Sequence, residues 1–319
     1  MQHEQHEWGQ GMFLTGITDE AADTIDEQIA VCRELGWRWI DLRTTEGENI
    51  TNISELKFGR LLDALAESEI GVSSFSAAIA NWGRRVTDPF ETDLAELERA
   101  IPRMHRAGTR FLRIMSYRPE AGEGTERWSE PEVEREVIRR LRELARRADD
   151  GGIVLLHENC DTWGGQSLEH TQRLLEAVDS PAFSLVFDTG NPVETRDHRA
   201  DAPGERQDAF EFYRAVREHI SYVHIKDGYV TGGKTIYTMP GEGDARVPEI
   251  LADLRATGYD GGFSIEPHVA VVHHDPSITA DPEERRRSFL EYARRTEELL
   301  LRAGYTVTGD HVGSHRSRK

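Results

Sequence analysis

The stretch "FSLVFDTGNPVET" (Phe183–Thr195) guides the interpretation of the whole chain. A short apolar run ends on a carboxylate, Asp188, and the turn-forming residues "TGNP" follow directly. This pattern predicts a buried strand that stops at a turn. A carboxylate at the end of a buried strand must be paired, solvated or bound to a cation. The ends of the other strands therefore become informative.

Seven further runs resemble this one and alternate with longer segments of helical period. In "TIDEQIAVCRELGW", for example, Ile25, Ile29, Cys32 and Leu35 form one apolar stripe. Alternating strands and helices predict a parallel sheet, and eight repeats predict a closed (β/α)8 TIM barrel, an α/β fold. The predicted strands are "MFLTGI" (12–17), "RWIDLR" (38–43), "GVSSFS" (71–76), "RFLRIMSY" (110–117), "GIVLLHEN" (152–159), "FSLVFD" (183–188), "SYVHIKD" (221–227) and "GFSIEP" (262–267).

The domain organisation follows from these repeats. The 319 residues are enough for one large core, and we expect a single barrel domain over residues 12–304. Residues 1–11 are predicted to be a disordered leader, and residues 305–319 a loose C-terminal tail.

Composition and charge exclude several classes of protein. The chain has no apolar run of about 18 residues and no apolar segment near its N-terminus, so neither a membrane span nor a signal peptide is expected. With only Cys32 and Cys160, a disulfide framework is not expected, and a cytoplasmic location is predicted. The formal net charge of −19 disfavours binding to nucleic acid or to an anionic membrane.

Four consecutive predicted strands each carry a possible metal ligand near the carboxyl end: Glu158, Asp188, His224 and Glu266. In a barrel these strand ends meet at one rim. Three crowded carboxylates would repel one another, and a divalent cation removes that repulsion. Three oxygen donors and one nitrogen donor suit Mn²⁺, our first expectation, or Mg²⁺ or Co²⁺, and Zn²⁺ stays open. The alternative is four separate helix caps or ion pairs.

Further polar and aromatic residues are candidates for substrate binding. Trp163 lies in a Gly-rich loop, where an aromatic ring could stack on a sugar or could simply pack. Arg113 lies within a predicted strand and is expected to have an anionic partner, either a ligand or a carboxylate. His157 points away from Glu158 on a regular strand, so packing is expected, and Cys160 is also interpreted as a packing residue.

Three more candidates follow the last two strands. His268 is two residues after Glu266 and should share its face, as a second base or a substrate contact. Lys226 and Arg246 could bind a phosphate or a carboxylate. They could equally pair with the nearby acids Asp227 and Glu242.

Five motifs in fixed order resemble the sugar phosphate isomerase/epimerase superfamily of xylose isomerase-like barrels: "HEN…W.G", "FDTGNP", "VHIKD", "MPGEGD" and "SIEPH". The resemblance extends from Met12 to about Gly304. This superfamily includes ketohexose 3-epimerases, inosose dehydratases and the endonuclease IV branch. The family's metal ligands, transferred by position, are Glu158, Asp188, His224 and Glu266.

The resemblance implies a metal-dependent isomerase or epimerase of a sugar, sugar phosphate or inositol-like ketone, acting by α-proton abstraction through a metal-stabilised enediolate. It assigns the proton transfers to Glu158 and Glu266. Asn191 stands where many such epimerases have a histidine that contacts the substrate. This departure, together with His268, leaves open a dehydratase or lyase that uses the same proton abstraction.

Two other functions fit the sequence less well. An endonuclease IV-type nuclease needs a three-metal site with additional histidines, and the charge of −19 opposes DNA binding. A non-catalytic barrel would have no reason to keep a costly carboxylate cluster. The expected partner is a small carbohydrate or polyol. Barrels of this type often pair, which leaves a homodimer or homotetramer open.

Overall fold

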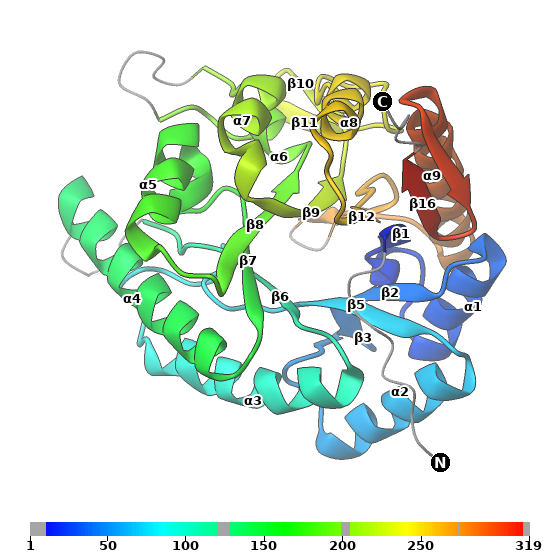
Figure 1. Cartoon of the computed structure of the whole chain (residues 1–319), viewed down its shortest axis with the longest axis horizontal. Coiled ribbons are helices and arrows are strands. Elements are labelled where there is room, and N and C mark those ends of the chain that lie inside the picture. Colours follow the sequence, from blue (N-terminus) through cyan, green and yellow to red (C-terminus); the bar gives the residue numbers. More distant parts are fainter. Residues whose placement is uncertain (1–10, 120–127, 199–204, 273–274, 315–319) are drawn as a thin grey trace.

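Eight parallel strands form a closed barrel in the computed structural model, which describes residues 11–119, 128–198, 205–272 and 275–314 (Figure 1). Their order around the barrel is β1, β12, β9, β8, β7, β6, β5 and β2, and a parallel bridge between Ile17 and Asp41 joins the last strand to the first. The predicted barrel is confirmed. The strands are β1 (Met12–Gly16), β2 (Trp39–Leu42), β5 (Gly71–Ser76), β6 (Phe111–Ile114), β7 (Val154–Glu158), β8 (Phe183–Asp188), β9 (Ile220–Ile225) and β12 (Gly262–Ile265).

The helices surround the barrel on its outside (Figure 1). The start and end of α1 illustrate how sequence defines them: Thr24 and Glu27 form a capping box, and Gly36 ends the helix in the left-handed conformation. The helices are α1 (Ile25–Leu35), α2 (Glu55–Glu67), α3 (Glu91–Ala107), α4 (Glu130–Asp150), α5 (Leu168–Val178), α6 (Asn191–Glu194), α7 (Ala209–Val216), α8 (Val247–Thr257) and α9 (Pro282–Arg302), with short 3-10 turns η1 (Thr18–Glu20), η2 (Trp163–Gln166) and η3 (Arg217–His219).

Short hairpins lie in loops that follow some of the barrel strands. They are β3 (Thr44–Thr45) with β4 (Glu48–Asn49), β10 (Gly228–Thr231) with β11 (Lys234–Tyr237), and β13 (Val271–Val272) with β14 (Asp275–Thr279).

An apolar layer lies inside the barrel, one step below the predicted metal ligands. Leu156, Val186 and Tyr222 are buried and form a separate cluster. Each precedes a predicted ligand by two residues along its strand, so ligand and apolar residue share the inner face. The packed layer therefore closes the barrel interior below the polar rim.

The C-terminal tail differs from its prediction. Residues 305–314 of the expected loose tail form a hairpin of β15 (Tyr305–Thr308) and β16 (His311–Ser314), and β16 pairs antiparallel with β1. Burial explains this, because Tyr305 packs against Phe263 and Val312 is also buried. Residues 315–319 and residues 1–10 of the expected leader lie outside the described part of the chain.

Among the described residues, no helix is both long and apolar enough to cross a membrane.

Candidate metal centre

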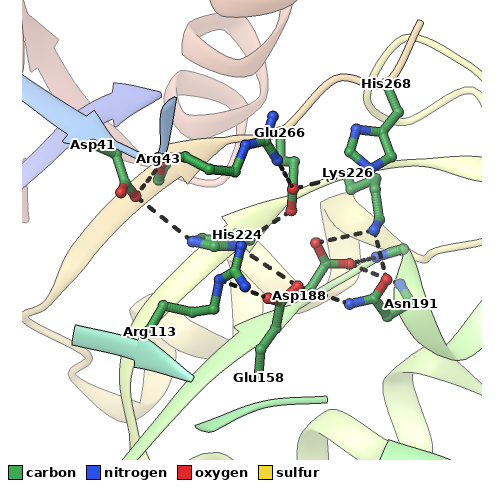
Figure 2. A network of polar contacts seen from close by, with 12 residues as sticks. Asp41, Arg43, Arg113, Glu158, Asp188, Asn191, His224, Lys226, Glu266 and His268 are labelled. Atoms are coloured by element: carbon green, nitrogen blue, oxygen red, sulfur yellow. Dashed lines mark hydrogen bonds and ion pairs between the residues drawn. The ribbon is translucent and has the colours of Figure 1, made fainter. Parts of the chain in front are cut away.

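The structure brings the four predicted ligands together at the carboxyl ends of adjacent strands (Figure 2). Glu158 ends β7 and Asp188 ends β8, while His224 lies one residue before the end of β9 and Glu266 directly follows β12. One donor atom from each side chain lies within 4.8 Å of the others, and all four residues are buried. This spacing is compatible with one shared cation.

Each of these side chains also keeps one buried polar atom without a hydrogen-bond partner among the described residues. The atoms are Glu158 Oε2, Asp188 Oδ2, His224 Nδ1 and Glu266 Oε2. Charged neighbours lie 3.1–3.5 Å from these atoms without forming a hydrogen bond. Buried polar atoms are nearly always hydrogen-bonded, so four such atoms in one place need an explanation. A divalent cation would provide it, and three carboxylates with one imidazole form a suitable donor set. The residues present therefore fit a divalent metal.

On one side of the cluster, the loop after β8 orients two of the ligands. Asp188 Oδ1 accepts hydrogen bonds from the backbone N–H groups of Gly190 at 2.8 Å and Asn191 at 2.7 Å. The Asn191 side chain donates from Nδ2 to Glu158 Oε1 at 3.0 Å. In both ligands, one carboxylate oxygen is held by the protein while the other is left without a hydrogen bond.

On the opposite side, residues of β2 and of the segment after it orient the other two predicted ligands, His224 and Glu266. Arg43 Nη1 donates to Glu266 Oε1 at 2.8 Å. Asp41 Oδ2 lies 3.7 Å from His224 Nε2, so the imidazole turns Nδ1 towards the carboxylates. A carboxylate behind a ligating histidine is the usual means of fixing its ring orientation.

Burial and neighbouring charge shift the pKa of several members of the cluster. Burial raises the pKa of Asp188 to about 7, although the charge of Lys226 opposes this shift. Burial alone would lower the pKa of His224, but the carboxylates of Asp41 and Glu266 outweigh it and raise the value to about 10. Without a cation, a proton on His224 thus offsets part of the carboxylate charge. Because metal ligands must be deprotonated, a cation would compete with that proton.

A cavity of about 510 Å³ opens onto the cluster. Glu158 and Glu266 line it, together with four of the predicted substrate-binding residues: Asn191, His268, Lys226 and Arg113. Cavities of this size suit small organic ligands.

The two cations among these residues are held by acids, as predicted for Arg113. Arg113 Nε lies 3.1 Å from Glu158 Oε2. Lys226 Nζ donates to Asn191 Oδ1 at 2.5 Å and lies 3.5 Å from both Asp188 and Glu194. Lys226 thus pairs with Asp188 and Glu194 rather than with Asp227, the partner that the sequence left open.

Asp227 instead organises the "MPGEGD" loop. Its carboxylate accepts hydrogen bonds from the backbone N–H groups of Gly228, Gly241, Gly243 and Ala245 at 2.7–3.2 Å. A Cβ atom at Gly243 would lie 2.3 Å from Asp227 Oδ1, so only glycine fits there. This motif therefore has a structural role beside the site.

His268 is fixed by Glu20 from η1. Its backbone N–H donates to Glu20 Oε2 at 2.8 Å, and its Nδ1 lies 2.8 Å from Glu20 Oε1. The other ring nitrogen, Nε2, lies 3.9 Å from Glu266 Oε1. His268 has a φ of 54°, which is unusual for a residue other than glycine. The ring is thus held next to a predicted catalytic carboxylate.

A comparison with known proteins identifies the family. Residues 29–295 match a family model described as xylose isomerase-like TIM barrel. The chain belongs to this family. The match agrees with the resemblance predicted from the motifs.

Among curated proteins, the barrel is similar to an inosose dehydratase from Geobacillus thermodenitrificans, with 28% identity over 178 residues. The alignment covers 50% of this chain and 52% of that protein, so the chain spans about half the length of the curated relatives it matches.

Among solved structures, it is similar to a xylose isomerase-like TIM barrel protein from Mycobacterium smegmatis in complex with magnesium, with a TM-score of 0.62 and 21% identity over 94% of this chain and 100% of the other. It is also similar to a protein named IOLI with a bound zinc atom, with a TM-score of 0.68 and 16% identity over 92% and 99% of the two chains. At these identities the similarity establishes the fold.

Two predicted substrate-binding residues of this family member lie away from the cavity. Trp163 is fully buried, stacks on His170 at 4.4 Å and donates from Nε1 to Glu130 at 2.8 Å. Arg246 is partly exposed and pairs with Glu249 at 2.8 Å. Trp163 has the packing role that the sequence left open, and Arg246 pairs with a different acid from the one considered.

The interpretations of His157 and Cys160 have different outcomes. His157 is buried against Phe183, and burial lowers its pKa to about 3, which agrees with packing. Cys160, by contrast, is only partly buried and lines the cavity, where burial and the charge of Glu158 raise the pKa of its thiol.

Sequence reasoning missed three polar residues beside the ligands: Asp41, Arg43 and Glu20. Asp41 and Arg43 are two residues apart in "RWIDLR", so they share a face of the strand and its extension. That spacing was the available signal, since two charged residues on one face of a barrel strand point to a polar interior.

Proposed function

We propose that this chain is a divalent-metal-dependent enzyme that removes the proton next to a carbonyl group of a sugar, sugar phosphate or related polyol, and that it catalyses isomerisation or epimerisation. The observation that carries this proposal is the set of four buried polar atoms without hydrogen-bond partners among the described residues, in a cluster whose members Glu158 and Glu266 line a cavity that suits a small molecule. A divalent cation held by Glu158, Asp188, His224 and Glu266 would polarise the carbonyl and stabilise negative charge on its oxygen.

Glu158 and Glu266 are the proposed proton carriers. Both line the cavity, and they come from strands that β8 and β9 separate. Each has an arginine beside it: Arg113 lies 3.1 Å from Glu158, and Arg43 donates to Glu266 at 2.8 Å. An ionised carboxylate at either position can accept a proton from the substrate carbon. Return of the proton from the opposite face would invert that carbon.

A second candidate is elimination, because the curated relatives that match half of this chain are inosose dehydratases. It begins with the same proton transfer. The carbon–oxygen bond on the next carbon then breaks, and the leaving hydroxyl group takes up a proton and departs as water. His268, whose Nε2 lies 3.9 Å from Glu266 Oε1, lines the cavity and is suited to contact that hydroxyl group.

The metal identity, the cytoplasmic location and a dimeric or tetrameric assembly stay predictions. Mn²⁺ is the proposed cation. Two structural relatives were solved with magnesium and with zinc, so these ions belong in the same test.

The proposal is tested in D₂O with Mn²⁺ and a panel of keto-sugars and inososes. Isomerisation or epimerisation incorporates deuterium next to the carbonyl, whereas elimination yields a product lighter by one water. Glu158→Gln and Glu266→Gln should fold and lose the exchange, while Glu249→Gln on the surface should keep it. Exchange retained in both glutamine variants would contradict the assignment of the proton carriers. An absence of both exchange and elimination across the panel would count against the proposed chemistry.

A further inference from the structure

The lining of the cavity includes apolar residues that the proposed proton transfers do not use. They are Trp82, Met115, Ala77 and Ala78. Trp82 is 39% exposed, which is unusual for a large hydrophobic side chain in the described part of the chain. Trp82 therefore combines solvent exposure with a place in the lining of the cavity.

The segment that carries Trp82 is firmly held. It lies between β5 and α3, and buried carboxylates of α3 bind its backbone: Asp93 accepts from the N–H of Ala80 at 3.2 Å, and Glu96 accepts from the N–H of Ala78 at 3.1 Å. Arg84, from the same segment, pairs with both carboxylates. These contacts fix both sides of Trp82 in the sequence.

Hydrogen bonds from the chain that continues after β6 complete the support. The N–H of Met115 donates to Ile79 O at 3.2 Å, and the N–H of Tyr117 donates to Ala80 O at 2.6 Å. Ala80 itself has a φ of 54°, a conformation that costs free energy in a residue with a Cβ atom. Such strain persists only where surrounding contacts enforce it, and it is common at ligand sites.

We propose that Trp82, together with Met115 of the same cavity lining, forms a platform for one face of a six-membered ring, and that the substrates are therefore cyclic polyols or cyclic keto-sugars rather than open-chain ones. This inference rests on the proposed function, because it concerns the same cavity. The carbon-bound hydrogens of a pyranose or cyclohexane ring form an apolar face that can cover an indole. An open polyol chain exposes hydroxyl groups on all sides and buries less apolar area on the same surface.

Preorganisation of Trp82 increases its expected contribution to binding affinity. A platform that is already held in place loses little conformational entropy when a ligand binds, so more of the contact free energy contributes to affinity. Polar groups deeper in the cavity, such as Asn191, Lys226 and His268, would then meet the hydroxyl groups at the ring edge.

The test uses the full chain loaded with Mn²⁺ and measures dissociation constants by calorimetry. The cyclic ligands are myo-inositol and methyl β-D-glucopyranoside, and the open-chain ligands are ribitol and sorbitol. In the wild type, the cyclic ligands should bind more tightly. Trp82→Ala should weaken them about tenfold, which corresponds to 1.4 kcal/mol, and change any open-chain binding less than about twofold. Trp82→Phe should keep most of the affinity.

Trp39→Phe serves as the control, because Trp39 lines a different cavity at the amino-terminal end of the barrel. It should bind all ligands as the wild type does. Equal loss for cyclic and open-chain ligands in Trp82→Ala, no loss at all, or a wild type that does not prefer cyclic ligands would overturn the inference. These ligands carry no ketone, so binding is independent of turnover. Binding that depends on Trp82 without deuterium exchange would contradict the proposed function but not the platform. Deuterium exchange with binding that does not depend on Trp82 would contradict the platform but not the proposed function.

Discussion

Replacement of Arg43 by glutamine should destabilise the protein strongly when no metal is bound. Arg43 is buried, with Nη2 at 2.7 Å from Asp19 and 3.2 Å from Glu20 and with Nη1 at 2.8 Å from Glu266. Burial alone would lower the pKa of Arg43, but the three carboxylates outweigh it and raise the value further. Removal of one partner from a buried ion pair typically costs about 3–5 kcal/mol, because the remaining charge stays buried and uncompensated. We expect a loss of that size in the free energy of unfolding.

The assay is urea unfolding in the presence of EDTA and again with excess Mn²⁺. A cation at Glu266 replaces some of the positive charge that Arg43→Gln removes, and binding at 100 times the dissociation constant stabilises a protein by about 2.7 kcal/mol. The free energy of unfolding of the variant should therefore be higher in Mn²⁺ than in EDTA, and should recover part of the loss measured in EDTA. Arg286→Gln is the matched control, because Arg286 pairs with Glu34 on the surface, and a change of about 0.5 kcal/mol is expected. A loss below about 1 kcal/mol in EDTA for Arg43→Gln would refute the reasoning.

Three further predictions concern other parts of the fold. Asp41→Asn should weaken Mn²⁺ binding about 10–100-fold, measured by competition with a chelator, because the ring of His224 loses its orienting carboxylate; unchanged affinity would speak against that role. Cys32 should resist alkylation at pH 8 in the folded protein and react after denaturation, because burial raises its pKa to about 12; rapid modification of the folded protein would contradict the structure. Val312→Ala should lower the free energy of unfolding by about 1–2 kcal/mol, because two buried methyl groups are removed, and an unchanged denaturation midpoint would mean that the C-terminal hairpin contributes little.

The barrel could be predicted from the sequence because its signals are local. Two predicted strands, 71–76 and 183–188, coincide with β5 and β8. The strand predicted at 110–117 is shorter, since β6 covers Phe111–Ile114. Its later residues bond elsewhere: Met115 and Tyr117 donate to the loop after β5, not to a neighbouring strand. No local pattern distinguishes those two uses of an extended chain.

The grouping of the predicted metal ligands followed from the sequence for a related reason. Strand alternation and barrel closure bring the last inward-facing residue of each strand to one rim, so Glu158, Asp188 and His224 could be grouped without coordinates. Their supporting residues were harder to find. Asp41 and Arg43 belong to β2 and the segment after it, and only closure of the barrel brings them beside His224 and Glu266.

The surroundings of the two tryptophans also depend on the three-dimensional fold. Trp163 begins the 3-10 turn η2 after β7, where a sugar-stacking residue could lie, yet its ring is fully buried and stacks on His170. Trp82 lies in a longer loop and lines the cavity. The C-terminal hairpin is a comparable case, because its pairing partner β1 lies about 300 residues earlier in the chain.

The most direct test of the metal centre is X-ray diffraction from crystals grown with Mn²⁺, measured at wavelengths on both sides of the manganese absorption edge. The structure predicts one strong anomalous peak, surrounded by Glu158, Asp188, the Nδ1 atom of His224 and Glu266. A map without a peak between these side chains, or with manganese only at other positions, would contradict the account.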